Sequence, residues 1–208
     1  MFTKDDLIAE LIKDGYLKTP AVIDAFKSID RKDFLPEEIK PGSENSSSRS
    51  VSNGEAARVS TSWKDRAYEN TALPIGYEQT ISQPLVVAFM LELLELKTGE
   101  KVLDVGSGSG WKAALMAEIV GESGRVVSIE RIEELHNFSK ANMQKYRNLI
   151  ERIVLILGDG SKGYLDGAPF DKIIAGAAGE EIPEAWKEQL KIGGKIVAPV
   201  KDSIIVLN

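Results

Sequence analysis

The chain has 208 residues, of which 43% are hydrophobic and 28% are charged, enough for one sizeable core with at most a small appendage. It has no cysteine and a single histidine, His136, which excludes disulfides and thiolate chemistry and leads us to expect no metal site. Because the net charge is −6, and no stretch has the apolar character of a signal peptide or of a membrane span of roughly 20 residues, we expect a cytoplasmic protein that binds neither membrane nor nucleic acid.

The first 40 residues predict a short helical segment. A helix is expected over residues 3–14, because Thr3 can cap its N-terminus, apolar residues recur at helical spacing, and Gly15 follows. A second helix is expected to begin at Pro20, since proline is favoured in the first turn. We therefore assign residues 1–40 to an N-terminal helical segment.

Residues 41–65 differ in composition from the rest of the chain. The stretch is rich in serine and poor in large apolar residues, so it cannot bury enough surface to offset the entropy of ordering. We expect a mobile loop or insert. The alternative is a lid that orders over a bound substrate, because long loops in compact domains are often functional.

From residue 66 onward, short apolar runs rich in β-branched residues alternate with helical patterns. The expected helices are 84–96, 111–120, 132–147 and 183–190, and the expected strands are 102–105, 125–129, 153–157, 172–177, 194–200 and, in addition, 203–207. This alternation predicts an α/β fold with a doubly wound, mostly parallel sheet covered on both faces. We assign residues 66–208 to one such domain.

A glycine-rich turn follows the first of these strands. The stretch VLDVGSGSG (102–110) runs from a buried strand through Gly106, Gly108 and Gly110 into a helix, which lets the backbone approach a ligand closely and offers free amides to an anionic group. NAD-binding turns place a third glycine where this chain has Trp111, so a dinucleotide is disfavoured. No Gly-Lys-Ser/Thr follows, so the phosphate-binding P-loop pattern is absent.

Acidic residues stand in or after three successive strands. Asp104 lies within the first strand, Glu130 ends the second and Asp159 follows the third. The carboxyl ends of adjacent parallel strands line one crevice, where a carboxylate can accept hydrogen bonds from both ribose hydroxyls. Each acid alone could be a solvated loop residue or a helix cap. Together they predict an adenosine site whose charge also suits a sulfonium cation.

Four longer stretches resemble one known family. They are AYENTALPIGYEQTISQP (67–84), VLDVGSGSGWKAALMAEIVGESGRVVSIER (102–131), LGDGSKGYLDGAPFDKIIAGAA (157–178) and IPEAWKEQLKIGGKIVAPV (182–200). They are similar to the protein-L-isoaspartate O-methyltransferases, as is DRKDFLP (30–36), and LPIGYEQTISQP is far more specific than the glycine turn. The resemblance implies a class I methyltransferase-like Rossmann fold, S-adenosyl-L-methionine as cofactor, and methylation of L-isoaspartyl carboxylates in damaged proteins as a repair reaction.

The resemblance also implies roles for individual residues. Cofactor and substrate would meet at Thr80, Ile81 and Ser82, with the Ser82 hydroxyl as the catalytic group that orients the isoaspartyl carboxylate. The wall of the substrate cleft would be Pro74, Ile75 and Gly76. The cofactor would be held by Asp104, Gly106, Ser107, Gly108, Gly110, Glu130, Asp159 and Gly160, with the turn on its methionine part, Glu130 on the ribose, and Asp159 and Gly160 on the adenine. For Ser82 the alternative is an ordinary helix cap before Pro84.

Methyl transfer from a sulfonium to an already ionised carboxylate needs positioning more than acid–base help, which agrees with the shortage of histidine and cysteine. We therefore expect His136 at the surface. The three tryptophans, Trp63, Trp111 and Trp186, are expected as packing anchors, with Trp111 also close to the cofactor.

The chain departs from the family pattern at two places. The family usually has aspartate at the position of Asn70, and it usually continues through further strands and a substrate-contacting tail where this chain stops at Asn208. We therefore expect either a domain shortened at its C-terminus or an incomplete peptide cleft.

Three rival functions remain open from the sequence. A nucleic-acid methyltransferase would require a basic face and an N-P-P-Y-like stretch where this chain has the acidic AGAAGEEIP. A degenerate cofactor-binding module is favoured by Asn70 and the short C-terminus. An oxidoreductase is disfavoured by Trp111. For the enzyme we expect isoaspartyl proteins or peptides as substrates and a monomeric state.

Overall fold

The computed structural model describes residues 2–37 and 62–208. Most of the expected mobile insert, residues 41–61, lies outside this range. Its last residues are described and form a short 3-10 helix, η2 (Trp63–Arg66), whose first turn is capped by the Ser62 hydroxyl. Within the described residues, no helix is both long enough and apolar enough to cross a membrane.

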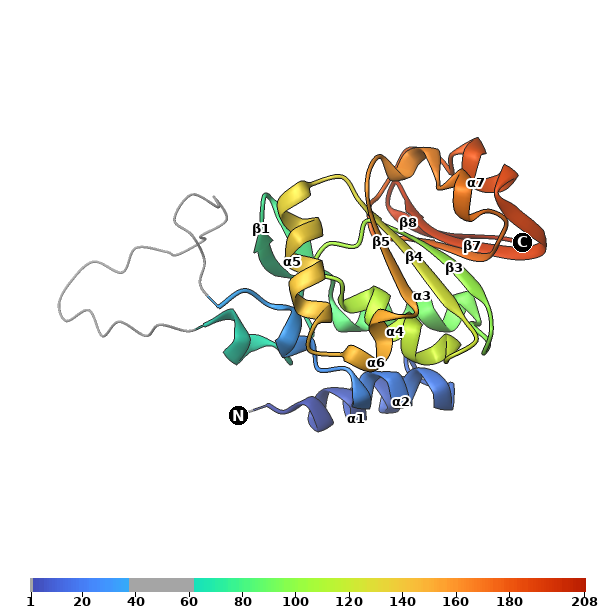
Figure 1. Cartoon of the computed structure of the whole chain (residues 1–208). Coiled ribbons are helices and arrows are strands. Elements are labelled where there is room, and N and C mark those ends of the chain that lie inside the picture. Colours follow the sequence, from blue (N-terminus) through green and yellow to red (C-terminus); the bar gives the residue numbers. More distant parts are fainter. Residues whose placement is uncertain (1, 38–61) are drawn as a thin grey trace.

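A six-stranded sheet forms the centre of the molecule (Figure 1), in the order β5-β4-β3-β6-β7-β8. Neighbouring strands are parallel except for β7 and β8, which are antiparallel. The strands are β3 (Lys101–Val105), β4 (Arg125–Glu130), β5 (Ile153–Leu157), β6 (Phe170–Ala175), β7 (Leu190–Val200) and β8 (Ser203–Leu207). This confirms the predicted mostly parallel, doubly wound sheet.

The order of the strands fixes where a ligand can bind. From β3 the chain moves outward through β4 and β5, and then returns to the other side of β3 with β6 and β7. The order in which strands are added across the sheet therefore reverses between β3 and β6, although the two strands themselves are parallel. In open α/β sheets, ligands bind outside the carboxyl ends of the strands at such a switch point.

Helices and 3-10 turns cover the sheet and make up the N-terminal segment. They are α1 (Lys4–Lys13), α2 (Pro20–Ser28), η1 (Arg31–Phe34), α3 (Pro84–Leu94), α4 (Trp111–Val120), α5 (Glu133–Met143), α6 (Arg147–Ile150), η3 (Gly160–Lys162), η4 (Leu165–Gly167) and α7 (Glu184–Glu188). The N-cap predicted at Thr3 is present and forms a capping box, because the Thr3 hydroxyl accepts from the backbone N–H of Asp6 and Asp6 accepts from Thr3 in return.

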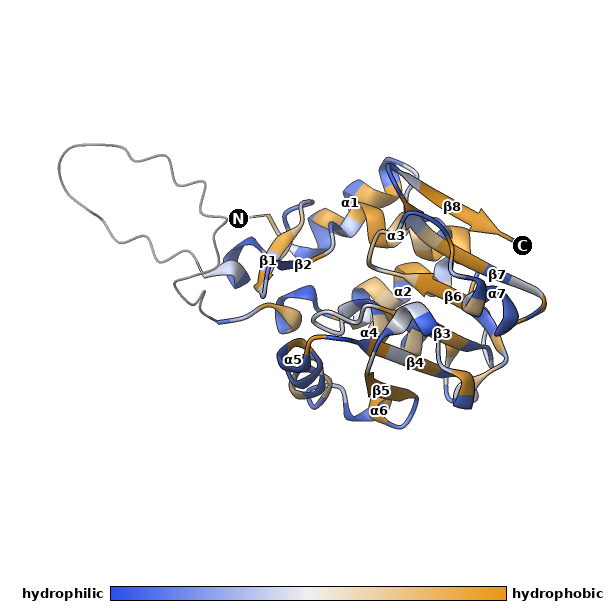
Figure 2. Ribbon diagram, turned by 90° about the horizontal axis from the view of Figure 1, so that it is seen from above, coloured by the Kyte–Doolittle hydropathy of each residue, from blue (hydrophilic) through white to orange (hydrophobic). Residues whose placement is uncertain are grey.

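Alternating strand residues divide the core into two layers. Val102 faces the larger layer with α1 to α5, whereas Leu103 faces a smaller layer with Trp186 of α7. Helix α4 is apolar nearly all round because it is sandwiched between the sheet and α2, where Phe26 meets Trp111 edge to face with ring centroids 5.6 Å apart. In Figure 2 the strands of the large sheet carry many hydrophobic residues, whereas α5 and α7 carry more hydrophilic ones.

The structure adds one element that the sequence did not indicate. An antiparallel hairpin, β1 (Leu73–Gly76) and β2 (Gln79–Ile81), precedes α3. Its two turn residues, Tyr77 and Glu78, both have positive φ, 55° and 57°. Two-residue hairpins favour such left-handed turn residues, but these usually come as Asn-Gly, so the turn lacked its sequence signature.

Several element boundaries and one burial expectation differ from the predictions. The helix expected over 84–96 ends at Leu94, and the helix expected over 183–190 spans Glu184–Glu188. The helix expected over 132–147 ends at Met143 and is followed by the separate α6, the strand expected at 172–177 spans 170–175, and β7 begins at Leu190 rather than at residue 194. The expectation that His136 lies at the surface is wrong, because only 7% of it is exposed. Helix α5 turns His136 inward next to Leu135, and within the described chain its Nδ1 has no hydrogen-bond partner.

The burial of His136 predicts a loss of stability at acid pH. Burial lowers the pKa of His136, and repulsion from Lys140 acts in the same direction against the weaker attraction of Glu130 and Glu133. The unfolded chain therefore takes up a proton near its ordinary pKa of about 6.5, which the folded protein takes up less readily. The free energy of unfolding is thus expected to fall as the pH drops below about 6.5, by at most about 1.4 kcal/mol per pH unit for this one group.

Urea unfolding between pH 8 and 5 measures this effect, with His136→Leu as the matched variant that cannot titrate. The stability difference between the two proteins should shrink or reverse sign toward acid pH. A difference that is constant across the series would mean that His136 has an ordinary pKa in the fold.

Candidate active site

The glycine turn joins β3 to α4 in the conformation expected from its sequence. Gly106, Gly108 and Gly110 have φ values of 81°, 53° and 91°, which are strained for residues with side chains. Gly110 also lacks space for a side chain, because an added Cβ would lie 2.6 Å from Ser139 Oγ. Glycine is therefore required at Gly110 both by the backbone conformation and by the close packing of α5.

Glu130 is fixed at the end of β4 by two backbone amides. Its Oε2 accepts from the N–H of Gly108 at 2.9 Å, and its Oε1 accepts from the N–H of Ile132 at 3.0 Å. The side chain is nearly buried, with 6% exposed. Each carboxylate oxygen has lone pairs beyond these bonds, so Glu130 can still accept hydrogen bonds from a ligand.

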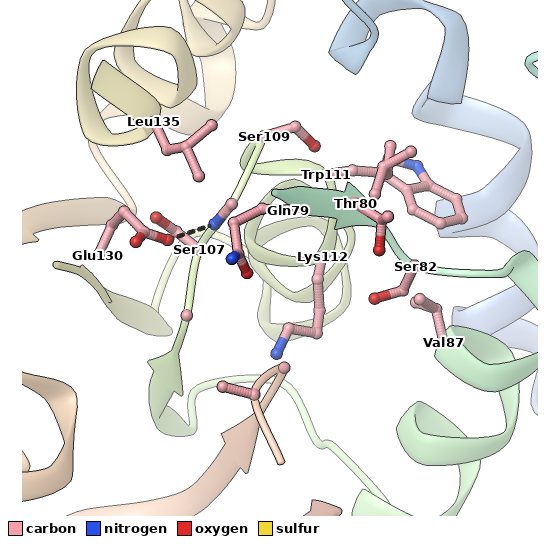
Figure 3. A pocket seen from close by; sticks show the side chains of 15 residues that line it. Gln79, Thr80, Ser82, Val87, Ser107, Ser109, Trp111, Lys112, Glu130 and Leu135 are labelled. Atoms are coloured by element: carbon pink, nitrogen blue, oxygen red, sulfur yellow. Dashed lines mark hydrogen bonds between the residues drawn. The ribbon is translucent and has the colours of Figure 1, made fainter. Parts of the chain in front are cut away.

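Two adjoining cavities open at the carboxyl edge of the sheet. The smaller cavity has a volume of about 90 Å³ and is lined by Gln79, Thr80, Ile81, Ser82, Val87, Gly106, Ser107, Gly108, Ser109, Trp111, Lys112, Glu130, Leu135, Gly176 and Ala177 (Figure 3). The larger cavity, of about 430 Å³, is lined by Gln79, Val105, Gly106, Ile129, Glu130, Arg131, Ile132, Asp159, Gly160, Ser161, Ala177, Ala178, Gly179, Glu181, Pro183, Trp186, Ala198 and Pro199. Because Gln79, Gly106, Glu130 and Ala177 line both, one elongated ligand can extend through the two.

The structure brings together most of the residues predicted for the site. Thr80, Ile81, Ser82, Ser107 and Gly108 line the smaller cavity, Asp159 and Gly160 line the larger one, and Gly106 and Glu130 line both. Pro74, Ile75, Gly76, Asp104 and Gly110 line neither. The hairpin nevertheless lies close to the turn, because Ile75 Cδ1 is 3.5 Å from where a Cβ on Gly108 would stand.

In the larger cavity, Asp159 is an exposed and ionised acceptor. Hydrogen bonds from the Ser161 hydroxyl and backbone N–H, 2.7 and 3.0 Å long, lower the pKa of Asp159. Behind it, the indole N–H of Trp186 donates to the carbonyl of Gly160 at 2.8 Å. Trp186 thus anchors the loop after β5, as expected for a packing residue.

Ser82 lies in the loop between β2 and α3, and its expected alternative role is wrong. The N-cap of α3 is Gln83, without a side-chain capping bond, so Ser82 does not cap the helix. The capping bond comes from farther away: Asn70 Oδ1 accepts from the N–H of Leu85 at 3.0 Å. An amide oxygen thus makes the helix contact that a carboxylate could also make, so the departure from aspartate at Asn70 retains an acceptor at this helix end.

Arg31 connects the N-terminal segment to the loop that carries Ser82. Its guanidinium donates to the carbonyls of Ala67, Glu69, Thr71 and Ser82, at 2.7, 3.2, 2.8 and 3.0 Å. It also lies 5.3 Å from the centroid of the Trp111 ring. Arg31 is only 2% exposed, and burial lowers its pKa to about 9. One buried cation therefore orders both the approach to the hairpin and the exit from it.

Sequence reasoning missed Lys112 and the small residues at the end of β6. Lys112 lines the smaller cavity, and its Nζ lies 2.7 Å from Oδ1 of the fully buried Asp104, whose Oδ2 accepts from Ser128 Oγ at 2.7 Å. The sequence could have indicated a special role for Lys112, because it is the second residue of a predicted helix and the helix dipole disfavours a cation there. Gly176 and Ala177 were missed because the strand was expected to extend to residue 177, whereas β6 ends at Ala175 and leaves both at the smaller cavity.

Comparison with known proteins shows similarity to one family of methyltransferases. The family model for protein-L-isoaspartate(D-aspartate) O-methyltransferase matches residues 2–61 and 55–206. The protein-L-isoaspartate O-methyltransferase of Ignicoccus hospitalis is 43% identical over 201 residues, which cover 96% of this chain and 82% of the relative. That of Methanopyrus kandleri is 40% identical over 200 residues, covering 96% and 77%.

Solved structures give the same result. A protein-L-isoaspartate O-methyltransferase that is 30% identical aligns with a TM-score of 0.76, covering 95% of this chain and 55% of its own. A structure from Plasmodium falciparum in complex with S-adenosyl-L-homocysteine is 23% identical, with a TM-score of 0.73 and coverage of 98% and 92%, and supports the fold.

Proposed function

The chain belongs to the protein-L-isoaspartate O-methyltransferase family, and from this premise we propose that its two adjoining cavities carry out methylation of the L-isoaspartyl carboxylate in damaged proteins. The reaction is a repair reaction and depends on S-adenosylmethionine. The observation that carries the proposal is the smaller cavity, where the segment with Thr80 and Ser82 faces the glycine turn and Glu130. Donor-binding and acceptor-binding residues thus share one space.

The residues present fit the cofactor. Glu130 offers fixed carboxylate oxygens to a ribose diol, the turn from Gly106 to Gly110 offers a backbone that can approach the methionine part closely, and Asp159 and Gly160 border a cavity of about 430 Å³ that suits the adenine. When bound, S-adenosylmethionine supplies an activated methyl group whose transfer to a carboxylate oxygen forms a methyl ester and releases the neutral thioether. Asp104 stands behind this site, paired with Lys112.

The chain contributes mainly positioning. We assign to the Ser82 hydroxyl, with Thr80 beside it, the task of orienting the acceptor carboxylate, and to Pro74, Ile75 and Gly76 the outer wall that the hairpin forms. The acceptor is already ionised at neutral pH, so no general base is needed. Correct orientation of reacting groups can supply about 7–11 kcal/mol of the barrier in favourable cases.

The proposed activity is tested with labelled S-adenosylmethionine and a synthetic isoaspartyl peptide, with the normal aspartyl peptide of the same sequence as control. Label should enter the isoaspartyl peptide alone. Tight cofactor binding without transfer to that peptide would instead identify a cofactor-binding module. The nucleic-acid alternative finds no support at the segment after β6, which brings Glu181 to the larger cavity.

Replacing Glu130 with alanine is expected to weaken cofactor binding at least about tenfold, since two charge-assisted hydrogen bonds of about 1.5–3 kcal/mol each would be lost. Isothermal titration with S-adenosylhomocysteine measures this directly. Because Glu130 also holds the N–H groups of Gly108 and Ile132, the melting temperature must be followed as well. Glu133→Ala, on the exposed first turn of α5, is the matched control. Unchanged affinity in a folded Glu130 variant would remove this residue from the ribose role.

We also propose that residues 66–208 form the cofactor-binding domain and residues 1–40 an N-terminal segment that supports its acceptor side. The contacts of Arg31 with the carbonyls from Ala67 to Ser82 support this division of roles. A monomer is the proposed working unit, because the residues assigned to the site come from a single chain.

A further inference from the structure

A buried cation, Lys112, lines the smaller cavity and has no role in the positioning of the acceptor by Ser82 and Thr80. The Lys112 side chain is 10% exposed, and its Nζ lies 3.2 Å from where a Cβ on Gly176 would stand, at a cavity that Thr80 and Ser82 also line (Figure 3). Its charged neighbour is Asp104, at 2.7 Å, but the contact lacks hydrogen-bond geometry. Among the described residues, Lys112 Nζ has no hydrogen-bond partner. The ammonium thus keeps donors free at the wall of the cavity, and because Nζ itself is covered, the side chain must rotate toward the cavity to present them to a ligand.

The position of Lys112 is electrostatically costly for the free protein. It stands at the second residue of α4, where the helix dipole disfavours a cation. A buried ammonium also loses hydration, which a single carboxylate contact repays only with good geometry and further hydrogen bonds. Asp104 meanwhile already accepts a hydrogen bond from Ser128. Among the described residues, both Lys112 Nζ and Asp104 Oδ1 lack a hydrogen-bond partner, and of the two residues only Lys112 lines the smaller cavity.

We propose that the Lys112 ammonium binds a ligand carboxylate in the smaller cavity and that Asp104 positions it for this task. This inference rests on the proposed function, which brings two carboxylates to this cavity, the methionine carboxylate of the cofactor and the isoaspartyl carboxylate of the acceptor. Either carboxylate would bring a negative charge that offsets the repulsion between the ammonium and the positive charge of the cofactor. The shared chemistry is a carboxylate held by a charge-assisted hydrogen bond.

The test compares each ligand with its counterpart that lacks the carboxylate, in the native chain and in Lys112→Met. For the cofactor, the pair is S-adenosylhomocysteine and its decarboxylated analogue. For the acceptor, the pair is an isoaspartyl peptide and the corresponding isoasparaginyl peptide, both titrated in the presence of S-adenosylhomocysteine. In the native chain, one of these pairs should differ in Kd by at least about tenfold. In Lys112→Met, that ratio should fall to about one.

Two further variants keep the result interpretable. Lys112→Met leaves Asp104 buried without its counter-ion, which is strongly destabilising in general. The double variant Asp104→Asn with Lys112→Met removes both charges and should fold while showing the same loss of the ratio. Lys97→Met makes the same chemical change at an exposed lysine outside both cavities and should leave both ratios at their native values.

The inference is overturned if both ratios keep their native values in the folded double variant, because Lys112 would then only neutralise Asp104. The pair whose ratio collapses identifies the carboxylate that is bound. The two binding ratios require no turnover, so failure of methyl transfer in the native chain would count against the proposed function alone. A native ratio near one for both pairs would likewise refute a carboxylate role for Lys112.

Discussion

Replacing Ser82 with alanine is expected to lower kcat for an isoaspartyl peptide about 10²-fold, while the Kd for S-adenosylhomocysteine changes less than about twofold. The size follows from the usual cost of removing one hydrogen-bond donor that is aimed at a reacting oxygen. Ser82 lines the smaller cavity but not the larger one, where the adenosine is proposed to bind. Its loss should therefore affect the orientation of the acceptor rather than retention of the cofactor.

Single-turnover methyl transfer at saturating cofactor, together with isothermal titration, separates the two effects. Ser123→Ala is the matched control, since Ser123 is exposed in the turn after α4 and lines neither cavity. Normal turnover at saturation combined with a large loss of cofactor affinity would contradict the assignment of Ser82 to the acceptor.

Replacing Arg31 with methionine is expected to lower the free energy of unfolding by about 3–5 kcal/mol. Methionine can fill much of the volume of the arginine side chain. The guanidinium would be lost, however, as the shared donor to the carbonyls of Ala67, Glu69, Thr71 and Ser82. Chemical denaturation measures the effect. Because one of these carbonyls belongs to Ser82, the surviving folded enzyme should also show a lower kcat.

Arg31→Lys distinguishes the geometry of the guanidinium from its charge. An ammonium keeps the charge, but it cannot span four carbonyls in the way a planar guanidinium does. We therefore expect Arg31→Lys to be nearly as destabilising as Arg31→Met. Lys32→Met, on the same turn but exposed, is the control. Full stability of Arg31→Lys would show that charge alone matters at this position.

The parts of the fold that were predictable are those with local signals. Helix α4 spans 111–120 as predicted, because a glycine turn precedes it and Gly121 follows, and the apolar runs 153–157 and 203–207 are strands as predicted. The β1–β2 hairpin was missed because its turn uses Tyr77 and Glu78 in left-handed conformations. The burial of His136 was missed because it depends on how α5 packs against the rest of the protein. The sequence of α5 mixes polar and apolar residues and does not show which side of the helix faces inward.

The residues of the candidate site also fall into those that the sequence could predict and those that it could not. Gly106, Gly108, Glu130 and Asp159 could be predicted because a parallel sheet brings its strand ends to one edge. The roles of Arg31 and Asn70 could not, because their partners are 51 and 15 positions away for the contacts with Ser82 and Leu85. The sequence places Lys112 just after the glycine turn, but it does not reveal the orientation of the side chain, which depends on the contact with the buried Asp104.

The two amide contacts of Glu130 have a consequence for the energetics of cofactor capture. A glutamate side chain that is immobilised by a ligand gives up as much as about 1.5–2 kcal/mol of rotamer entropy. Here the N–H groups of Gly108 and Ile132 hold the carboxylate through bonds made within the fold itself, so that ordering cost falls on folding and not on association. In the ribose role proposed for Glu130, an incoming nucleoside would meet an acceptor that is already in place, and more of the interaction energy would remain as affinity.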